Sequence, residues 1–362
     1  MKIKEVRTGY FNIKLKSPFK ISLGTITEAQ NVVVEIETDQ GHKGIGEAAP
    51  MPLVTGDTQE GIALAIHKYL RPILLEEDPR QIKKLSGKLK SSLQGNPGAH
   101  VAVEMALFDL LGEIYRIPLY ILWGGNSNFF EGDCTVSLDT PAVMAEKAKE
   151  IVERGYSYIK IKVGEGLEKD LTKISQISEK IGSQASLRLD ANQGWDVKEA
   201  IQIIKKLEKY NIDLLEEPIS RGNLEGMVLI RSRANIPIMA DETVFNPREA
   251  LAVIKAGAAD LINIKLMKAG GILAAREIDG LARTAGLECM VGCMLESRVA
   301  ITAAAHLVAS SPNITRADLD SPLILERDPV QGGVKIEGEK YILPEKPGLG
   351  VKLDREEIQF LE

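Results

Sequence analysis

The feature that most constrains the fold is a repeat in the middle of the chain, where short β-rich segments alternate with amphipathic stretches. Successive β-rich segments begin roughly 25 residues apart. The stretches between them, such as 140–155, 197–210 and 246–258, carry apolar residues at helical spacing. Eight strands that alternate with helices predict an α/β fold with a parallel sheet closed into a barrel. The eight segments are residues 133–139, 157–163, 186–192, 212–218, 236–242, 260–266, 287–295 and 313–320.

The parts of the chain before and after this repeat have a different pattern. Residues 1–125 begin with alternating strand-like runs and continue with helix-like runs, as in an α+β domain. The turn-rich stretch after about residue 330 is expected to return to that domain. We therefore predict a capping domain over residues 1–125, completed by 330–362, and a barrel domain over 126–329. No low-complexity linker separates them, so the two domains should pack tightly.

Composition narrows the classes of partner and compartment. The 362 residues carry a net charge of −6, and no basic block is present that could neutralise nucleic-acid phosphates. The N-terminal segment alternates and carries charges, unlike a signal peptide, and no apolar run reaches the roughly 18 residues needed to cross a bilayer. The three cysteines include no CxxC pair, which fits reduced thiols. We expect a cytoplasmic protein that binds neither nucleic acid nor membranes.

The strand at residues 157–163 contains two lysines whose direction follows from strand geometry. Ile159 and Ile161 suit the side that faces the helices. Because alternate residues of a strand face opposite sides, Lys160 and Lys162 then point into the barrel. Charged residues near the C-terminal ends of barrel strands indicate an active site rather than a stabilising core. The same alternation places these residues inside: Asp190, Asn192, Glu216, Asp241, Asn263, Lys265, Asp318 and Asp320.

Three acidic residues end three neighbouring strands of this barrel. Asp190, Glu216 and Asp241 follow one another on the third, fourth and fifth strands. Three carboxylates in one confined site cannot all stay ionised unless a cation lies among them. Ligands that are all oxygen atoms suit Mg²⁺. The sequence therefore predicts a magnesium site at the C-terminal end of the barrel.

Lysines lie on both sides of the acidic cluster. Lys162 is on the second strand, and Lys265 and Lys268 are at the end of the sixth, which lies opposite in an eight-stranded barrel. Two bases that face each other across one carbon allow one to remove a proton while the other returns a proton from the opposite side, which inverts a stereocentre. The metal would bind the substrate carboxylate and stabilise the charge of an enediolate.

Each of these motifs alone has an ordinary structural explanation. The KxK of residues 160–162 fits a solvated strand face, the EEP of 216–218 a solvated strand end, and the DxD of 318–320 a helix cap. Their joint placement around one regular repeat favours a catalytic site. The alternative outside enzymes is a barrel that binds a small molecule without turnover, which the three acids and opposed lysines disfavour.

Several longer motifs resemble the muconate-lactonizing branch of the enolase superfamily, and the resemblance covers nearly the whole chain. They are KIKVG, RLDANQGW, LLEEP, ADE, NIKLMKAGG and the upstream AVEMALFDLLG. The resemblance implies a modified TIM barrel, (β/α)7β, with an N-terminal α+β capping domain whose loops around 18–28 and 50–58 close over the substrate. It also implies Mg²⁺, for which we expect Mn²⁺ to substitute. Carried over residue by residue, it assigns the metal ligands Asp190, Glu216 and Asp241 and the acid/base pair Lys162 and Lys268.

Within that branch, the run RADLDSP resembles the DxD of dipeptide epimerases. Asp318 and Asp320 would offer paired carboxylates to the α-ammonium of a dipeptide whose C-terminal carboxylate lies on Mg²⁺, with the Cα of the C-terminal residue between the two lysines. The expected function is thus that of an isomerase, a dipeptide epimerase; a muconate cycloisomerase, an o-succinylbenzoate synthase and an N-acylamino acid racemase are alternatives. The other predicted substrate-binding residues are Thr135, Lys160, Asn192, Lys265, Met294, Glu296, Gly24 and Ile26.

One departure from the family concerns the first capping loop. Family members specialised for Ala-Glu have an arginine there, whereas the run PFKISLGTITEA has Gly24 and no arginine, with Lys16 and Lys20 nearby as the possible substitutes. We therefore expect apolar or broad specificity rather than strict Ala-Glu specificity. A homo-oligomer is also expected. The preferred dipeptide, the pathway, the subunit number and the epimer served by each lysine do not follow from the sequence.

Overall fold

The computed structural model describes residues 1–22 and 24–361, and its central feature is an eight-stranded parallel sheet. Each β-rich segment predicted from the sequence contains one of its strands, which follow one another around the sheet from β5 to β12. The ends of the sheet meet where the Asp133 N–H donates to the Ala317 carbonyl at 3.1 Å. The predicted barrel is thus confirmed. Its strands are β5 Cys134–Val136, β6 Tyr158–Lys162, β7 Ser186–Asp190, β8 Ile212–Glu216, β9 Ile238–Ala240, β10 Leu261–Lys265, β11 Glu288–Gly292 and β12 Ile314–Asp318.

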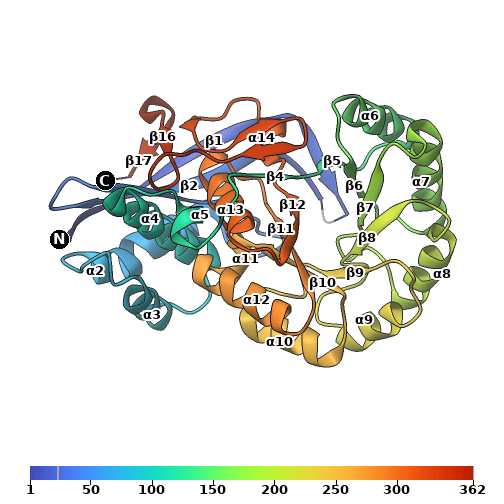
Figure 1. The fold of residues 1–362 in the computed structure, drawn as a ribbon, viewed down its shortest axis with the longest axis horizontal. Helices are drawn as coiled ribbons and strands as arrows, with labels where there is room; N and C mark the ends of the chain where they lie inside the picture. Colours follow the sequence, from blue (N-terminus) through green and yellow to red (C-terminus); the bar gives the residue numbers. More distant parts are fainter. Residues whose placement is uncertain (23, 362) are drawn as a thin grey trace.

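Helices form the outer layer of the barrel (Figure 1). A helix follows each of the first seven strands, whereas only a four-residue helix follows β12, which gives the predicted (β/α)7β order. Several helices begin at polar caps, since the side chains of Asp196, Asn223 and Asn246 each accept from an N–H of the first turn. The helices are α6 Pro141–Glu153, α7 Leu167–Ile181, α8 Val197–Leu207, α9 Leu224–Arg231, α10 Pro247–Ala256, α11 Leu266–Ala269, α12 Ile272–Thr284, α13 Arg298–Ser310 and α14 Ser321–Ile324.

The first part of the chain forms an antiparallel sheet covered by helices. Both ends of the chain belong to it, because the last strand pairs with the first (Figure 1). The predicted α+β cap is present, while its exact division from the barrel at residues 125 and 330 stays a prediction. Its elements are β1 Ile3–Ile21, β2 Gly24–Thr38, β3 Lys43–Ala48, β17 Gln359–Phe360, α1 Gln59–Ala65, the π-helix η1 Ile66–Leu70, α2 Arg71–Leu74, α3 Ile82–Ser92, α4 Pro97–Tyr115 and α5 Leu119–Leu122.

Short strands from the last part of the chain join the cap to the barrel. In the C-terminal segment, β15 pairs with β4, just before the barrel, and β17 pairs with β1 of the cap, so this segment contacts both parts of the molecule; β13 pairs with β16 within it. These elements are β4 Phe129–Glu131, β13 Val330–Gly332, β14 Lys335–Glu337, β15 Lys340–Ile342, β16 Val351–Leu353 and the 3₁₀ turn η2 Arg355–Glu357.

Close packing of the cap on itself depends on glycine in β3. A Cβ built on Gly46 would lie 1.9 Å from the Ala102 carbonyl oxygen of α4, and one built on Gly44 would lie 2.2 Å from that of Ala106. Real atoms cannot approach so closely, so only glycine lets β3 lie directly on α4. This contact brings Glu47 at the end of β3 to the N-terminus of α13, where it accepts from the Ser297 and Ala300 N–H groups at 2.8 Å each.

The β1–β2 hairpin extends from the cap to the C-terminal end of the barrel. Figure 1 shows it running across the molecule so that its tip lies beside β5 and β6. There the Lys20 carbonyl accepts from the Leu138 N–H at 3.0 Å, and the Ser22 hydroxyl donates to the Asn192 carbonyl at 2.8 Å. The first predicted capping loop is therefore this hairpin tip, of which residue 23 lies outside the described residues.

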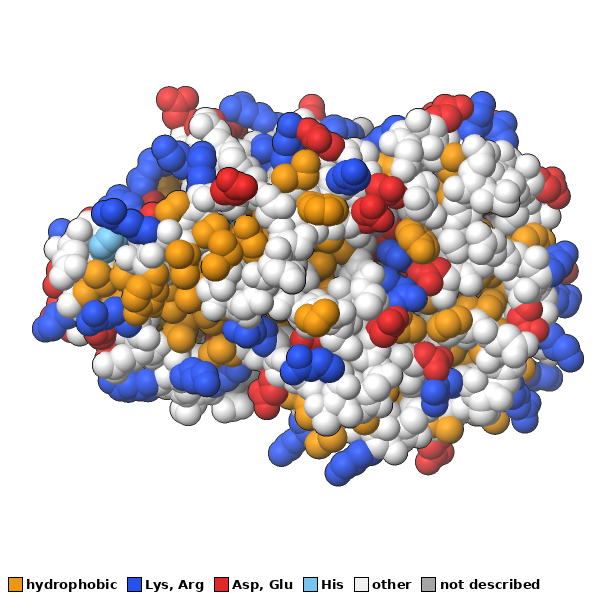
Figure 2. Space-filling view, viewed as in Figure 1, with side chains coloured by type: hydrophobic (Ala, Val, Ile, Leu, Met, Phe, Trp, Pro, Cys, Tyr) orange, Lys and Arg blue, Asp and Glu red, His pale blue; other side chains and the backbone are white. Residues whose placement is uncertain are grey.

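One outer face of the cap carries exposed hydrophobic side chains. Figure 2 shows them gathered over the region of α4 and α5, where Tyr115 is 52% exposed and Ile121 is 48% exposed. Among the residues that the structure describes, no helix has both the length and the apolar character needed to cross a membrane.

Candidate active site

The interior of the barrel is arranged in layers from one end to the other. At the N-terminal ends of the strands, the Arg188 guanidinium binds Asp133 at 2.8 Å and Asp213 at 2.9 Å. A separate apolar layer of four buried side chains lies inside the sheet, formed by Leu214, Met239, Leu261 and Met290. The acids and lysines predicted for the site lie beyond it, at the C-terminal ends. An apolar layer therefore separates the ion pairs at the N-terminal end of the barrel from the predicted site at its C-terminal end.

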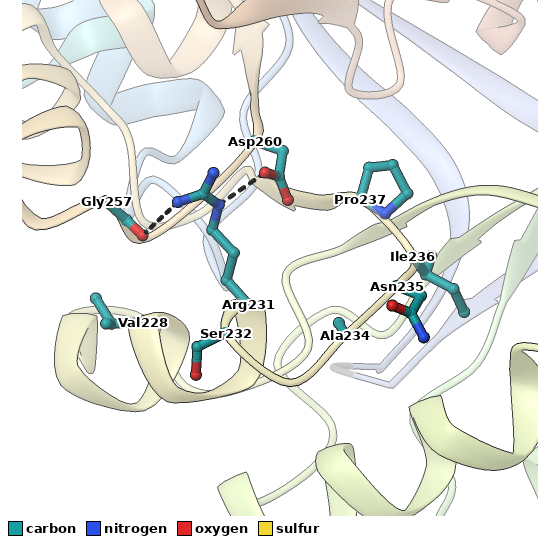
Figure 3. Close-up of a pocket in the computed structure, with 9 residues that line it drawn as sticks. All are labelled: Val228, Arg231, Ser232, Ala234, Asn235, Ile236, Pro237, Gly257 and Asp260. Carbon is teal, nitrogen blue, oxygen red and sulfur yellow. Dashed lines mark hydrogen bonds and ion pairs between the residues drawn. The ribbon is translucent and has the colours of Figure 1, made fainter.

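A pocket of about 360 Å³ lies at the N-terminal end and is not a candidate for the chemistry. Its residues precede β9 and β10 or belong to the ends of α9 and α10 (Figure 3). Its one arginine, Arg231, is already paired with Asp260 at 2.7 Å and with the Gly257 carbonyl at 3.2 Å. Polar groups at this end of a barrel ordinarily serve stability rather than catalysis.

Lysines pair with the three predicted acidic ligands at the C-terminal end. Asp190, Glu216 and Asp241 are each 0% exposed. The Lys160 ammonium lies 3.1 Å from Asp190 and 2.7 Å from Glu216, and Lys265 lies 2.7 Å from Asp241. No three of the described His, Cys, Asp and Glu side chains are arranged to hold one metal ion. The positive charges that the structure describes next to the acids are the ammonium groups of these lysines.

The ionisation of the acids follows from this pairing. Burial opposes the charged form of Asp190, but Lys160 and Lys162 outweigh it and hold the pKa of Asp190 below its usual range. In contrast, burial and repulsion by Asp190 raise the pKa of Glu216 to about 8.

The donor atoms at the acids fit a hard divalent cation. All are carboxylate oxygens, the ligands that Mg²⁺ prefers. The Oε2 atom of Glu216 is buried and has no hydrogen-bond partner among the described residues, although the Lys160 ammonium is near it. Asp190, Glu216 and Asp241 are therefore the residues that would hold the ion.

The two predicted acid/base lysines bind acids on opposite sides of this cluster. The Lys162 ammonium donates to Asp190 at 2.6 Å and to the Asn192 side-chain oxygen at 3.1 Å. Lys268 lies in α11, just after β10, where it binds the Asp241 carboxylate and donates to the Asn263 carbonyl at 3.2 Å. Both are nearly buried, with 6% and 3% of their surface exposed. The acids of β7, β8 and β9 therefore lie between the two ammonium groups.

The DxD carboxylates line one cavity together with Lys160 and Lys162. Asp318 accepts from Lys160 at 2.6 Å, and Asp320 accepts from the Thr135 N–H at 2.6 Å. Burial opposes the ionisation of Asp318, but Lys160 and Lys162 outweigh it and leave the pKa of Asp318 below its usual range. Burial and repulsion by Asp318 raise the pKa of Asp320 to about 6. The pair can therefore present negative charge at neutral pH.

A cavity of about 60 Å³ lies beneath the hairpin tip beside the DxD carboxylates, whereas Asp190, Glu216, Asp241 and Lys268 are outside its lining. It is far smaller than the roughly 300 Å³ of an ordinary small-ligand pocket, so substrate entry requires the lining side chains to move apart. Seven of the predicted substrate-binding residues, together with Lys162, line it: Thr135, Lys160, Asn192, Lys265, Met294, Asp318 and Asp320.

Three predicted substrate contacts lie elsewhere. Ile26 pairs with Phe19 across the hairpin but is outside the cavity lining. Glu296 is 1% exposed and accepts from the Met294 N–H at 3.0 Å, so it shapes the loop rather than the cavity wall. Gly24 lines a neighbouring surface pocket of about 830 Å³ instead.

The loops that the family resemblance placed over the substrate, around 18–28 and 50–58, do cover the cavity, but the apolar side chains that form this roof were not predicted individually. Phe19 and Ile21 come from the hairpin, Met51 and Val54 from the second capping loop, and Ile324 from α14. Strand alternation predicts only that such residues face one side of the cap sheet, so it offered no signal that they cover the barrel. The missed polar lining residues are Glu242, Cys293 and Ser321.

Comparisons with known proteins agree with this geometry. Residues 3–124 match the N-terminal domain of the mandelate racemase/muconate lactonizing enzyme family, and residues 143–358 match the enolase C-terminal domain-like family. An L-Ala-D/L-Glu epimerase of Clostridium acetobutylicum is 43% identical over 354 residues, which cover 97% of this chain and 99% of that protein. A hydrophobic dipeptide epimerase of Enterococcus faecalis is 44% identical over 353 residues, with the same coverage of 97% and 99%.

A solved structure extends the likeness to three dimensions. The crystal structure of the dipeptide epimerase from Enterococcus faecalis, complexed with Mg and the dipeptide L-Leu-L-Tyr, matches with a TM-score of 0.95 at 44% identity. The match covers 97% of this chain and 100% of that one. The chain therefore belongs to the mandelate racemase/muconate lactonizing enzyme family of the enolase superfamily.

Proposed function

We propose that this protein is a Mg²⁺-dependent dipeptide epimerase that inverts the Cα of the C-terminal residue of an L,L-dipeptide. The observation that supports this most directly is the placement of Lys162 and Lys268 on opposite sides of the acidic cluster, with Asp318 and Asp320 in the same cavity region as Lys162. The epimerase relatives, at 43% and 44% identity, support the same reaction class.

The roles of the side chains follow from their chemistry. In its neutral form, Lys162 takes the Cα proton of one epimer and Lys268 supplies a proton to the opposite face; the reverse reaction exchanges the two roles. When bound at Asp190, Glu216 and Asp241, Mg²⁺ would supply positive charge for the enediolate that forms between these steps. Because this charge grows in the transition state, its stabilisation accelerates the reaction.

The substrate ammonium is assigned to the DxD pair. Asp318 and Asp320 lie next to the cavity and can accept hydrogen bonds from an α-ammonium that has left water. The Lys160 ammonium already offsets one of the two negative charges of Asp318 and Asp320. One further cation, the substrate ammonium, would balance the other. N-acyl amino acids, cycloisomerase substrates and succinylbenzoate precursors carry no such ammonium.

The side-chain preference is proposed to be apolar or broad. Phe19, Ile21 and Val54 cover the cavity, and no arginine lies on the described hairpin tip to hold a glutamate. Lys16 donates to the Leu323 carbonyl at 2.8 Å and is thus engaged elsewhere, while Lys20 lines the neighbouring surface pocket. A dipeptide with an apolar C-terminal side chain would bury that side chain against this roof.

A dipeptide screen tests the function directly. The protein is incubated with Mg²⁺ and pooled L,L-dipeptides in D₂O, and mass spectrometry then records which dipeptides gain one mass unit. Apolar dipeptides should gain deuterium and yield L,D products, whereas their N-acetylated forms should not. Faster turnover of N-acylated amino acids than of free dipeptides would favour the racemase alternative, and exchange without any inversion would contradict an epimerase.

Three further proposals accompany this function. Mn²⁺ should replace Mg²⁺, because it also accepts oxygen ligands. A cytoplasmic location without nucleic-acid or membrane partners agrees with the acidic composition and the cysteine pattern. A homo-oligomer is supported by the exposed hydrophobic side chains near α4 and α5, such as Tyr115 and Ile121.

A further inference from the structure

Asn192 is held at four points beside the predicted metal ligand Asp190. Its N–H donates to Asp190 at 3.0 Å, and its carbonyl accepts from the Ser22 hydroxyl at 2.8 Å. Its side-chain oxygen accepts from Lys162 at 3.1 Å, and its side-chain NH₂ donates to Glu242 at 3.1 Å. The backbone has φ of 40°, a left-handed conformation that asparagine tolerates better than most residues. With the backbone held, the side chain keeps rotation about its own bonds, including the rotation that exchanges the two ends of the amide.

The partners of the amide determine its orientation. An ammonium group only donates, so the side-chain oxygen of Asn192 must face Lys162. The opposite end of the amide then carries two N–H groups that need an acceptor, and Glu242 Oε1 is the acceptor recorded for them. Without that acceptor, rotation by 180° would turn an NH₂ group towards the ammonium of Lys162 and remove the hydrogen bond.

Among the residues that the structure describes, Glu242 has no other hydrogen bond that accounts for its position. It is 3% exposed, lines the cavity, and its second oxygen has no hydrogen-bond partner among the described residues. Burying a carboxyl with a single side-chain partner destabilises the fold. Its presence therefore calls for a role other than stability. The comparable buried acid Glu217, in contrast, accepts from the Asp241 and Thr243 N–H groups and so has a structural explanation.

We propose that Glu242 is a positioning residue for the Lys162 half of the reaction, which acts by fixing the amide of Asn192. This inference rests on the proposed epimerase function and adds to it an asymmetry between the two bases. Lys268 contacts Asp241 and Asn263 and neither Asn192 nor Glu242. Loss of the Glu242 acceptor should therefore impair proton transfer on one face of Cα and spare the other face.

The test compares Glu242→Leu, Glu242→Gln and the wild-type enzyme in D₂O, with each epimer of one dipeptide supplied separately. Deuterium gain and inversion are measured at early times for both. Glu242→Leu should reduce inversion, and exchange into the epimer served by Lys162, by about 10- to 100-fold, since a base displaced by about 1 Å loses that much. Exchange into the other epimer should fall by less than about threefold, because Lys268 can take the proton and, once its ammonium has exchanged with D₂O, return a deuteron to the same face.

Two matched variants separate positioning from other roles. Glu242→Gln keeps an oxygen acceptor, so it should lose at least about tenfold less than Glu242→Leu. Asn192→Gly adopts φ of 40° without strain and removes the amide, so it should show the same one-sided loss even if Glu242→Leu fails to fold. Lys162→Ala identifies the epimer that Lys162 serves. In the Glu242 and Asn192 variants, the affinity for Mg²⁺, measured by titration, should stay within about threefold of wild type.

The outcomes distinguish this inference from the function on which it rests. Three results would overturn the positioning role while leaving the epimerase function intact. They are an equal loss of exchange in both epimers, full activity of both Glu242→Leu and Asn192→Gly, and a loss in Glu242→Gln as large as in Glu242→Leu. Absence of inversion by the wild-type enzyme would overturn both. A one-sided loss that Glu242→Gln largely restores supports the proposal.

Discussion

The Lys160 ammonium donates to Asp318 across the barrel at 2.6 Å, and this pair joins the predicted ammonium clamp to the predicted metal ligands. The same ammonium lies 2.7 Å from Glu216 and 3.1 Å from Asp190. Burial disfavours the charged form of Lys160, yet Asp190, Asp318 and Glu216 outweigh it and raise the pKa of Lys160 well above its usual value. One buried lysine thus offsets charge in both halves of the site.

Replacing Lys160 by Met should destabilise the metal-free protein strongly. The change leaves several buried carboxylates without their shared cation, and removal of one partner of a buried ion pair typically costs about 3–5 kcal/mol. The measurement is urea unfolding in excess EDTA. Lys147→Met is the matched control, since Lys147 is 39% exposed and lies 3.5 Å from Asp139; its effect should be below about 1 kcal/mol. A similarly small loss of unfolding free energy in Lys160→Met would contradict the proposal that Lys160 offsets the charge of the buried carboxylates.

The pH dependence of dipeptide capture should report Asp320. Burial and the neighbouring Asp318 raise the pKa of Asp320 to about 6. The carboxylate accepts the substrate ammonium only when ionised, so kcat/KM should fall as the pH decreases through about 6 and should level off above it. Asp320→Asn should raise KM at pH 8 and remove this acid limb. If the limb persists unchanged in Asp320→Asn, another group is responsible for it.

Metal removal should abolish activity. Excess EDTA should stop deuterium exchange and inversion together, and Mg²⁺ should restore both. Asp241→Asn should lower kcat by at least about 100-fold, because a ligand that helps offset developing negative charge contributes several kcal/mol. Isothermal titration with Mg²⁺ separates weaker binding from slower chemistry. Full activity of the wild-type enzyme in EDTA would show that the acids serve another purpose.

The contact between cap and barrel should depend on Glu47. This buried residue accepts from the N–H groups of Ser297 and Ala300 and from the Asn31 amide. Glu47→Gln places an NH₂ group against one of these donors, and an unsatisfied buried donor costs about 1–3 kcal/mol. The free energy of unfolding should fall by that amount in urea. Glu153→Gln, at a 62% exposed side chain, should change it by less than about 0.5 kcal/mol.

The order of strands and the direction of their side chains could be predicted from the sequence because both follow from simple periodicity. Alternation along residues 158–162 placed Lys160 and Lys162 inside, and both are buried there. It could not choose between Lys265 and Lys268, since Lys268 lies in the helix that follows the strand, where alternation by two no longer applies. The family resemblance made that choice.

The family resemblance placed the loops around 18–28 and 50–58 over the site, but the side chains of the cavity roof could not be predicted from the residues themselves, for a different reason. Phe19 and Met51 reach the barrel only because the cap folds back over it, and contacts between distant segments leave no local pattern in one sequence. The same holds for the Asn192 amide, whose bonds to Ser22 and Glu242 join residues 170 and 50 positions apart. Packing between domains, rather than local propensity, decides these features.

The most direct measurement of the two-base mechanism is deuterium exchange by the two single lysine variants, with each epimer supplied separately in D₂O. If Lys162 and Lys268 serve opposite faces, Lys268→Ala should abolish inversion yet still exchange deuterium into one epimer, and Lys162→Ala should exchange only the other, if at all. Both rates are expected to be lower than those of the wild-type enzyme, because each lysine also contributes charge beside Asp190 or Asp241. Substantial interconversion of the epimers by either variant would contradict the mechanism.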